Sequence, residues 1–155
     1  MNIPATINPV YLANMDGKLS SVQSVTTNTA ASINTCTSCS ELSALKGASD
    51  EILAEFNKSK KTIEDYFTDQ LAEIGKSING LLPLLVAPGD LGGVISWITN
   101  MITNLQGPYT KVIALQAEMI AKQTEFAGKL ATQTTNINNL QSSIAAKSAT
   151  LNCGL

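Results

Sequence analysis

The chain has 155 residues and a formal net charge of −2 at pH 7, and all its basic residues are Lys, because the sequence contains neither Arg nor His. Without Arg it lacks the usual bidentate ligand for phosphate and guanine, and a net-negative chain gains little from counterion release, so nucleic acid is excluded as an expected partner. Without His it lacks the usual general base near neutral pH and the usual nitrogen ligand of metals, so we expect no enzymatic activity, no catalytic residues, no metal and no cofactor.

Residues 1–48 are predicted to form an N-terminal arm and a weak heptad segment. Pro4 and Pro9 favour an extended arm, either reaching a neighbouring subunit or disordered, and the N-terminus has no basic stretch, apolar run or myristoylation glycine that would indicate a signal peptide or lipid anchor. From Leu12 to Cys36, core-type positions recur in steps of three and four. Low helix propensity on the flanks of this stripe means that the helix would need partners to form.

The next elements are a short helical turn over residues 40–46, ended by Gly47, and a stronger helix over residues 49–79. The stronger helix has Ile52, Phe56 and Ile63 at the start of one apolar face, and its first turn is rich in acids, as the helix dipole favours. Gly80 provides its expected stop.

Residues 81–105, which we call the apolar segment, form the expected tip between two long helices, with Asp90 as the only charge between residues 81 and 108. Prolines and glycines rule out one continuous transmembrane helix, and no Lys or Arg fringe marks a surface-binding helix. We expect its helical face to pack into the core of an oligomer, with insertion into a membrane as the alternative. The residues of this membrane or partner face are Leu91, Val94, Ile95, Trp97, Ile98, Met101 and Ile102.

Gly107 and Pro108 are expected to break the chain before a long helix over residues 109–151. Its core-type positions keep steps of three and four for six heptads, a pattern typical of a supercoiled partner rather than of a straight helix in a globule. Three glutamines lie in this stripe. If their amides pair across a symmetry axis, they fix the register and the copy number of the helices. The alternative is a loosely packed helix with a partly hydrated seam. The predicted oligomerisation residues, here called the C-terminal stripe, are Val112, Gln116, Met119, Gln123, Phe126, Leu130, Gln133, Ile137, Leu140, Ile144 and Leu151.

The predicted fold is therefore all-α: an elongated helical hairpin or bundle over residues 49–155, oligomeric, with a long C-terminal coiled-coil helix. A helix over residues 109–151 is about 65 Å long, whereas a compact domain of this size is roughly 40 Å across. Net charges of −3 over residues 49–80 and +2 over residues 109–155 favour pairing of these two helices, within one chain or between chains.

Cys36, Cys39 and Cys153 are predicted to form crosslinks where neighbouring subunits meet, with ordinary reduced thiols as the alternative. Cys36 and Cys39 form a C-x-x-C pattern, but no βαβ pattern surrounds it, and no second pair or His completes a tetrahedral metal site. A disulfide between cysteines so distant in the chain stabilises by about 4–5 kcal/mol through loop entropy.

These features predict a non-enzymatic structural protein that binds copies of itself and other proteins of a larger assembly. The heptads, rich in Asn, Thr and Gln, resemble in composition the coiled-coil fibres, tubes and collars of tailed bacteriophages. The resemblance implies a virion component, in a virion or other extracellular particle after a cytoplasmic stage. The alternative is a membrane-active, pore-forming or penetration protein that inserts residues 81–105.

Overall fold

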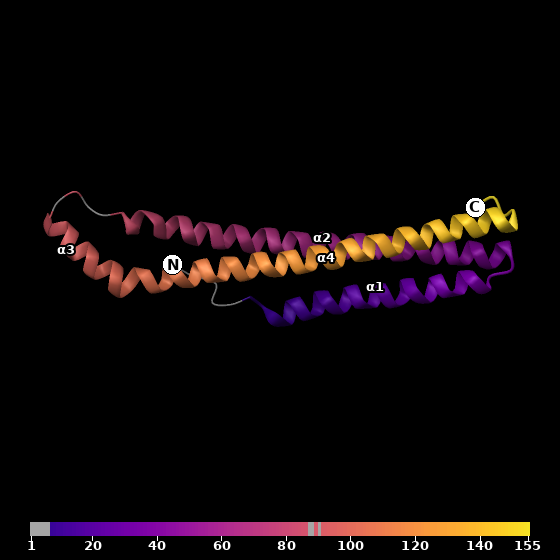
Figure 1. The fold of residues 1–155 in the computed structure, drawn as a ribbon, viewed down its shortest axis with the longest axis horizontal. Coiled ribbons are helices and arrows are strands. Elements are labelled where there is room, and N and C mark those ends of the chain that lie inside the picture. Colours follow the sequence, from indigo (N-terminus) through magenta and orange to yellow (C-terminus); the bar gives the residue numbers. More distant parts are fainter. Residues whose placement is uncertain (1–6, 87–88, 90) are drawn as a thin grey trace. The chain divides into compact units, whose positions relative to one another are not determined.

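The computed structural model describes residues 7–86, 89 and 91–155, and the chain is all-helical over these residues, as predicted. It has three long helices, α1 (Pro9–Thr35), α2 (Cys39–Leu81) and α4 (Gln106–Leu151) (Figure 1). Between α2 and α4 lie a 3₁₀ turn, η1 (Leu82–Leu85), the helix α3 (Leu91–Asn100) and a π-helical stretch, η2 (Met101–Leu105). Residues 1–6 of the predicted arm lie outside the described residues.

The chain divides into two compact units, and α2 and α4 each contribute to both. Among the described residues, unit 1 contains those of Asp65–Thr124 together with Ile7 and Asn8. Unit 2 contains Pro9–Glu64 and Glu125–Leu155, that is, α1, the first part of α2 and the last part of α4.

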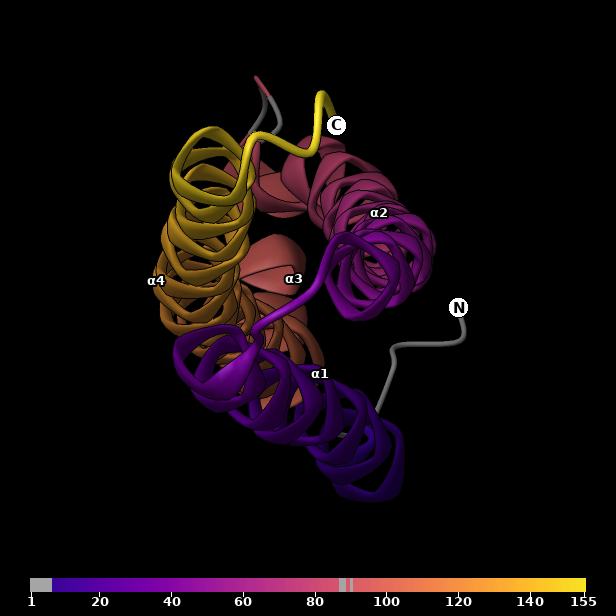
Figure 2. The same ribbon diagram turned by 90° about the vertical axis from the view of Figure 1, so that its right-hand side faces the viewer.

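Unit 2 is a three-helix bundle whose segments lie side by side (Figures 1 and 2). The helix α2 is antiparallel to α1 and α4, because α1 leads into α2 through a short connector and α4 ends where α2 begins. The buried residues of each helix recur at intervals of three and four, so one face of every helix packs against a shared core. The buried apolar side chains are Met15, Leu19, Val22, Ile33, Cys36, Leu42, Ile52, Phe56, Ile63, Phe126, Leu130, Ile137, Leu140 and Ile144.

Unit 1 has its core on the last part of α2 and the first part of α4. The ring of Phe67, which is 1% exposed, meets Tyr66 edge-on, with 5.4 Å between the ring centroids. The other buried apolar side chains of this unit are Ile7, Ile74, Leu81, Val112, Leu115 and Met119.

Two predicted helix breaks are absent. The predicted stop at Gly47 and new start at residue 49 are wrong, because α2 runs unbroken from Cys39 to Leu81, beyond the predicted end at residue 79. Leu42, Ser49 and Ile52 are all buried, so one stripe continues past the glycine and stabilises the helix there.

The break predicted at Gly107 and Pro108 is also wrong, because both residues lie inside the first turn of α4, which follows η2 directly. The N–H of Gln106 donates to the carbonyl of Met101, five residues earlier, which is the wider π-helical pattern. Pro108 has no N–H to donate to the preceding turn, and its fixed φ suits a first turn, so the helical path continues. Within the apolar segment, residues 91–105 form α3 followed by η2.

Candidate functional site

The C-terminal stripe is covered by the chain's own helices. Of its residues, Gln116, Gln123 and Leu151 are partly exposed and the others are buried. An intermolecular seam is therefore not needed to account for the burial of this stripe, and its role in oligomerisation stays a prediction.

Two polar contacts join α1 to α4 within unit 2. Lys129 forms ion pairs with Asp16 on α1 and, at 2.9 Å, with Glu125 on its own helix, and these contacts raise the pKa of Lys129, the Asp16 hydrogen bond having the larger effect. One turn later, the amide of Gln133 donates to the side-chain oxygen of Gln23 at 3.0 Å. Gln133 is 4% exposed and its own Oε1 has no hydrogen-bond partner. These residues fix the register of α1 against α4, although a buried acceptor without a partner destabilises the pairing.

A disulfide between Cys39 and Cys153 joins the start of α2 to the end of α4, with 5.3 Å between the two Cα atoms. The two cysteines are 114 residues apart in the sequence, and both belong to unit 2. The disulfide that the structure forms is therefore within one chain. Crosslinking between subunits through these cysteines stays a prediction.

Both helix ends at this disulfide carry a defined cap. At the start of α2, Ser38 Oγ accepts from the N–H of Glu41, and Glu41 Oε2 accepts from the N–H groups of Thr37 and Ser38, which is a capping box. The hydrogen bond from Thr37, and then that from Ser38, lower the pKa of Glu41.

At the end of α4, Asn152 has a positive φ of 56°, and the N–H of Cys153 donates to the carbonyl of Ser148 at 3.0 Å. This left-handed turn is a Schellman motif with Asn at the position where Gly is more usual, and it brings Cys153 to Cys39.

Cys36 is a buried free thiol at the end of the α1 stripe, and it donates to the carbonyl of Ser38. The C-x-x-C pattern therefore holds one disulfide-bonded cysteine and one buried thiol rather than a bonded pair. In the described part of the chain, no group of three or more Cys, Asp or Glu side chains is placed to hold a metal ion.

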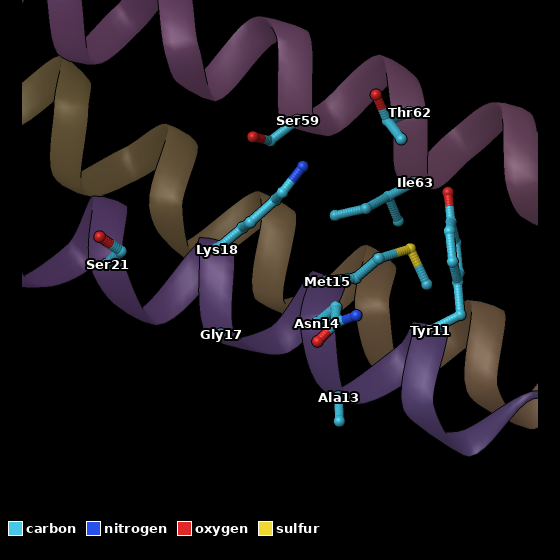
Figure 3. A pocket seen from close by; sticks show the side chains of 10 residues that line it. All are labelled: Tyr11, Ala13, Asn14, Met15, Gly17, Lys18, Ser21, Ser59, Thr62 and Ile63. Atoms are coloured by element: carbon cyan, nitrogen blue, oxygen red, sulfur yellow. The ribbon is translucent and has the colours of Figure 1, made fainter.

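A groove of about 550 Å³ lies between α1 and α2 in unit 2 (Figure 3). The ammonium group of Lys18 reaches across it towards Ser59 on α2, and the Thr62 hydroxyl donates to the carbonyl of Lys58 in its own helix. Its lining offers one cation, several hydroxyls and an amide, with no carboxylate or thiol to complete an acid–base or nucleophilic pair. The lining residues are Tyr11, Ala13, Asn14, Met15, Gly17, Lys18, Ser21, Ser59, Thr62 and Ile63.

The apolar segment in unit 1 leaves large aliphatic side chains in solvent. Val86 and Ile95 are 70% and 68% exposed, and Leu82, Leu84 and Ile98 are also exposed. The indole N–H of Trp97 donates to the carbonyl of Leu84 at 3.2 Å, which ties α3 to η1. Exposed aliphatic side chains on a folded element are typical of a surface that binds another molecule.

The predicted face on this segment is only partly described. Val94, Trp97 and Met101 are partly exposed, whereas the side chains of Leu91 and Ile102 lie outside the described residues. Among the described helices, none combines the length and the hydropathy needed to cross a bilayer.

Comparison of the chain with protein-family models, curated proteins and solved structures found no match. The interpretation therefore depends on the geometry of the two units alone.

Sequence reasoning missed three elements of the site. The capping box was present as the Ser38-x-x-Glu41 pattern, and Asn152 directly before Cys153 matched a left-handed cap. The pairing of Gln133 with Gln23 had no comparable signal, because the pattern of one helix does not indicate which residue lies opposite it.

Proposed function

We propose that this protein is a non-enzymatic structural component that assembles with copies of itself and with other proteins. The observation that carries the proposal is the grouping of five exposed large aliphatic side chains within residues 82–98, whereas the other five such side chains are spread over the rest of the described chain. Leaving five large aliphatic side chains in water is unfavourable, and a partner that covers them recovers this free energy.

The apolar segment suits a protein partner because α3 has exposed polar side chains next to its exposed aliphatic ones. Ser96 and Thr99 are exposed and directly follow Ile95 and Ile98 in the sequence. This arrangement is typical of the centre and rim of a protein interface. The heptad spacing of α4 supports the further proposal that the α4 helices of different chains supercoil around one another in the assembly.

The mass of the full-length protein in solution, measured by light scattering with circular dichroism to confirm helical folding, tests this function. We expect an oligomer. The paired substitution Val86→Asn and Ile95→Asn should lower the mean mass of the assembly, whereas Val25→Asn, at an exposed aliphatic position on α1, should not. A folded wild-type monomer at all concentrations tested would contradict the proposal.

The compositional resemblance of the heptads supports a place in a bacteriophage tail, collar or fibre, and so in an extracellular particle. Mass spectrometry of purified bacteriophage particles whose genome encodes this protein tests this proposal. Detection at a fixed stoichiometry to the other particle proteins supports it, and absence from intact particles contradicts it.

A second candidate is a membrane-active protein of the pore-forming or penetration type, and the same exposed aliphatic side chains favour it. In this case residues 81–105 insert into the bilayer after assembly. Leakage from lipid vesicles and flotation with them test the candidate, and the Val86→Asn and Ile95→Asn variant should abolish both. A folded wild-type sample that neither leaks vesicles nor floats with them excludes it.

A further inference from the structure

Of the three helices in unit 2, α1 is the one that the disulfide leaves out. Cys39 and Cys153 join α2 to α4, so these two helices stay together at this end even when α1 moves. The end of α1 connects to α2 only through residues 36–38. The disulfide therefore defines a two-helix surface on which α1 lies.

The buried stripe of α1 is weakly apolar. Thr26 and Thr29 occupy its middle, and the hydroxyl of Thr26 donates to the carbonyl of Val22 in the same helix, at 2.7 Å. A hydroxyl that is satisfied within its own helix gives no hydrogen bond to α2 or α4. Aliphatic contact is therefore concentrated towards the two ends of α1.

Open grooves flank α1 on both sides. The groove of about 550 Å³ in Figure 3 lies between α1 and α2, and a second groove of about 520 Å³ lies between α1 and α4. Asp16 and Gln23 from α1 line this second groove, opposite Lys129 and Gln133. The contact of α1 with the other two helices is therefore confined to its one buried stripe and these polar pairs.

The polar contacts of α1 give specificity rather than strength. The side chains of Lys129 and Asp16 are 37% and 49% exposed, so water solvates both when they separate. When α1 packs on its own chain, the Oε1 atom of Gln133 is buried without a hydrogen-bond partner. Detachment of α1 allows water to reach this atom. The same positions nevertheless require a helix that presents a carboxylate and an amide oxygen seven residues apart.

The connector between α1 and α2 is short and partly fixed. Glu41 holds the N–H groups of Thr37 and Ser38, so this part of the connector remains with α2. Between this fixed part and the end of α1 at Thr35 lies only Cys36, which is buried. Short hinge connections favour exchange of an element between identical chains.

We propose that α1 of one chain docks on the α2–α4 surface of a second copy, in a reciprocal exchange that forms the basic dimer of the assembly. This proposal rests on the proposed homo-oligomeric function and specifies how that oligomer is held. The occupant is a second α1 because every contact that α1 makes in its own chain, including Asp16 with Lys129 and Gln23 with Gln133, recurs between chains.

Isotope-mixed crosslinking tests the exchange directly. Equal amounts of ¹⁵N-labelled and unlabelled full-length protein, with the disulfide intact, are mixed in denaturant, refolded together and checked by light scattering against protein that was never unfolded. A carbodiimide then joins Asp16 to Lys129 at their ion pair, and mass spectrometry identifies which chains supplied the two peptides. Random pairing of exchanged chains gives mixed-isotope products in close to half of the Asp16–Lys129 crosslinks.

The Glu125–Lys129 pair is the internal control, because both residues lie on α4 of one chain and its crosslinks must keep a single isotope. A Gly-Ser-Gly-Ser insertion between Thr37 and Ser38 provides a second variant, because a longer connector makes it easier for α1 to fold back on its own chain. We expect this variant to show several-fold fewer mixed products, and the Val86→Asn and Ile95→Asn variant to keep the wild-type fraction in its remaining dimer.

The outcomes separate the two proposals. An oligomeric mass with only single-isotope Asp16–Lys129 products overturns helix exchange and leaves the assembly function standing. A monomeric mass overturns both.

Discussion

The two units use the same spacing of core positions with different results. In unit 2 a third helix and a disulfide close the bundle, whereas in unit 1 the described residues leave Val86 and Ile95 largely exposed. Both units draw on the same two helices, α2 and α4. The α2 and α4 faces are buried in both units, and the exposed aliphatic side chains of unit 1 lie on the segment between these two helices.

The difference also separates stability from recognition. Unit 2 combines a disulfide, two helix caps and polar contacts that set register, all of which hold its own chain together. Unit 1 contains the exposed aliphatic side chains of the apolar segment, which we propose bind a partner. The four predictions below test whether the units differ in this way.

Removal of the disulfide is expected to have the largest effect. The Cys39→Ser and Cys153→Ser double variant should lose about 4–5 kcal/mol of unfolding free energy on the loop-entropy model, because the cysteines close a very long loop. Urea unfolding followed by circular dichroism measures the loss. Cys36→Ala keeps the disulfide and serves as control. An unchanged midpoint for the double variant would show that the disulfide does not constrain the unfolded chain.

A matched pair of phenylalanines on α2 tests whether the units unfold together. Phe56 in unit 2 and Phe67 in unit 1 are 2% and 1% exposed, so substitution of either by Ala should cost about 3–5 kcal/mol. If the units unfold as one, both variants shift the same transition. If Phe67→Ala shifts only an earlier transition, unit 1 unfolds separately. We expect this result because no disulfide joins the described residues of unit 1.

The cap of α2 gives a smaller effect that depends on pH. Ser38→Ala should cost about 1 kcal/mol, because the N–H of Glu41 loses its acceptor. Glu41 has a lowered pKa in the folded chain, so its ionised form stabilises the fold above its ordinary value of 4.5 and this contribution disappears as the pH falls through the folded pKa.

Glu41→Gln keeps an acceptor for the N–H groups of Thr37 and Ser38 but does not titrate. The midpoint temperature of thermal unfolding should therefore be higher for the wild type than for this variant at neutral pH. The difference between the two midpoints should disappear in acid. A gap that stays constant through this range would mean that the charge of Glu41 does not contribute.

The sequence predicted the helical class and most of the buried positions, because a single helix determines its own apolar face. Of the stripe predicted from Leu12 to Cys36, Leu12 is partly exposed and the positions from Met15 onwards are buried, including Thr26 and Thr29. The sequence did not predict which helix would cover the C-terminal stripe. A heptad pattern is the same whether its partner lies in the same chain or in another one.

The wrong helix boundaries came from treating glycine and proline as stops. Gly47 lies inside α2, where Leu42 and Ile52 continue one buried stripe on either side of it. The cost of a helical glycine is about 1 kcal/mol, which burial of neighbouring apolar side chains exceeds. Local propensity therefore gave way to tertiary packing at this residue.

Two glycines on α2 provide the smallest and most closely matched test of the comparison. Gly47 lies in unit 2 and Gly75 in unit 1, both are helical, and a Cβ added at either meets no atom within 4 Å. Each substitution by Ala should therefore stabilise its own unit by about 0.5–1 kcal/mol, because Ala loses less backbone entropy on folding. Hydrogen exchange along α2 distinguishes the units: Gly75→Ala should raise protection within residues 65–81, and Gly47→Ala within residues 39–64. If either substitution raises protection equally along the whole helix, α2 couples the two units into one cooperative structure, and the contrast between them is one of exposed surface alone.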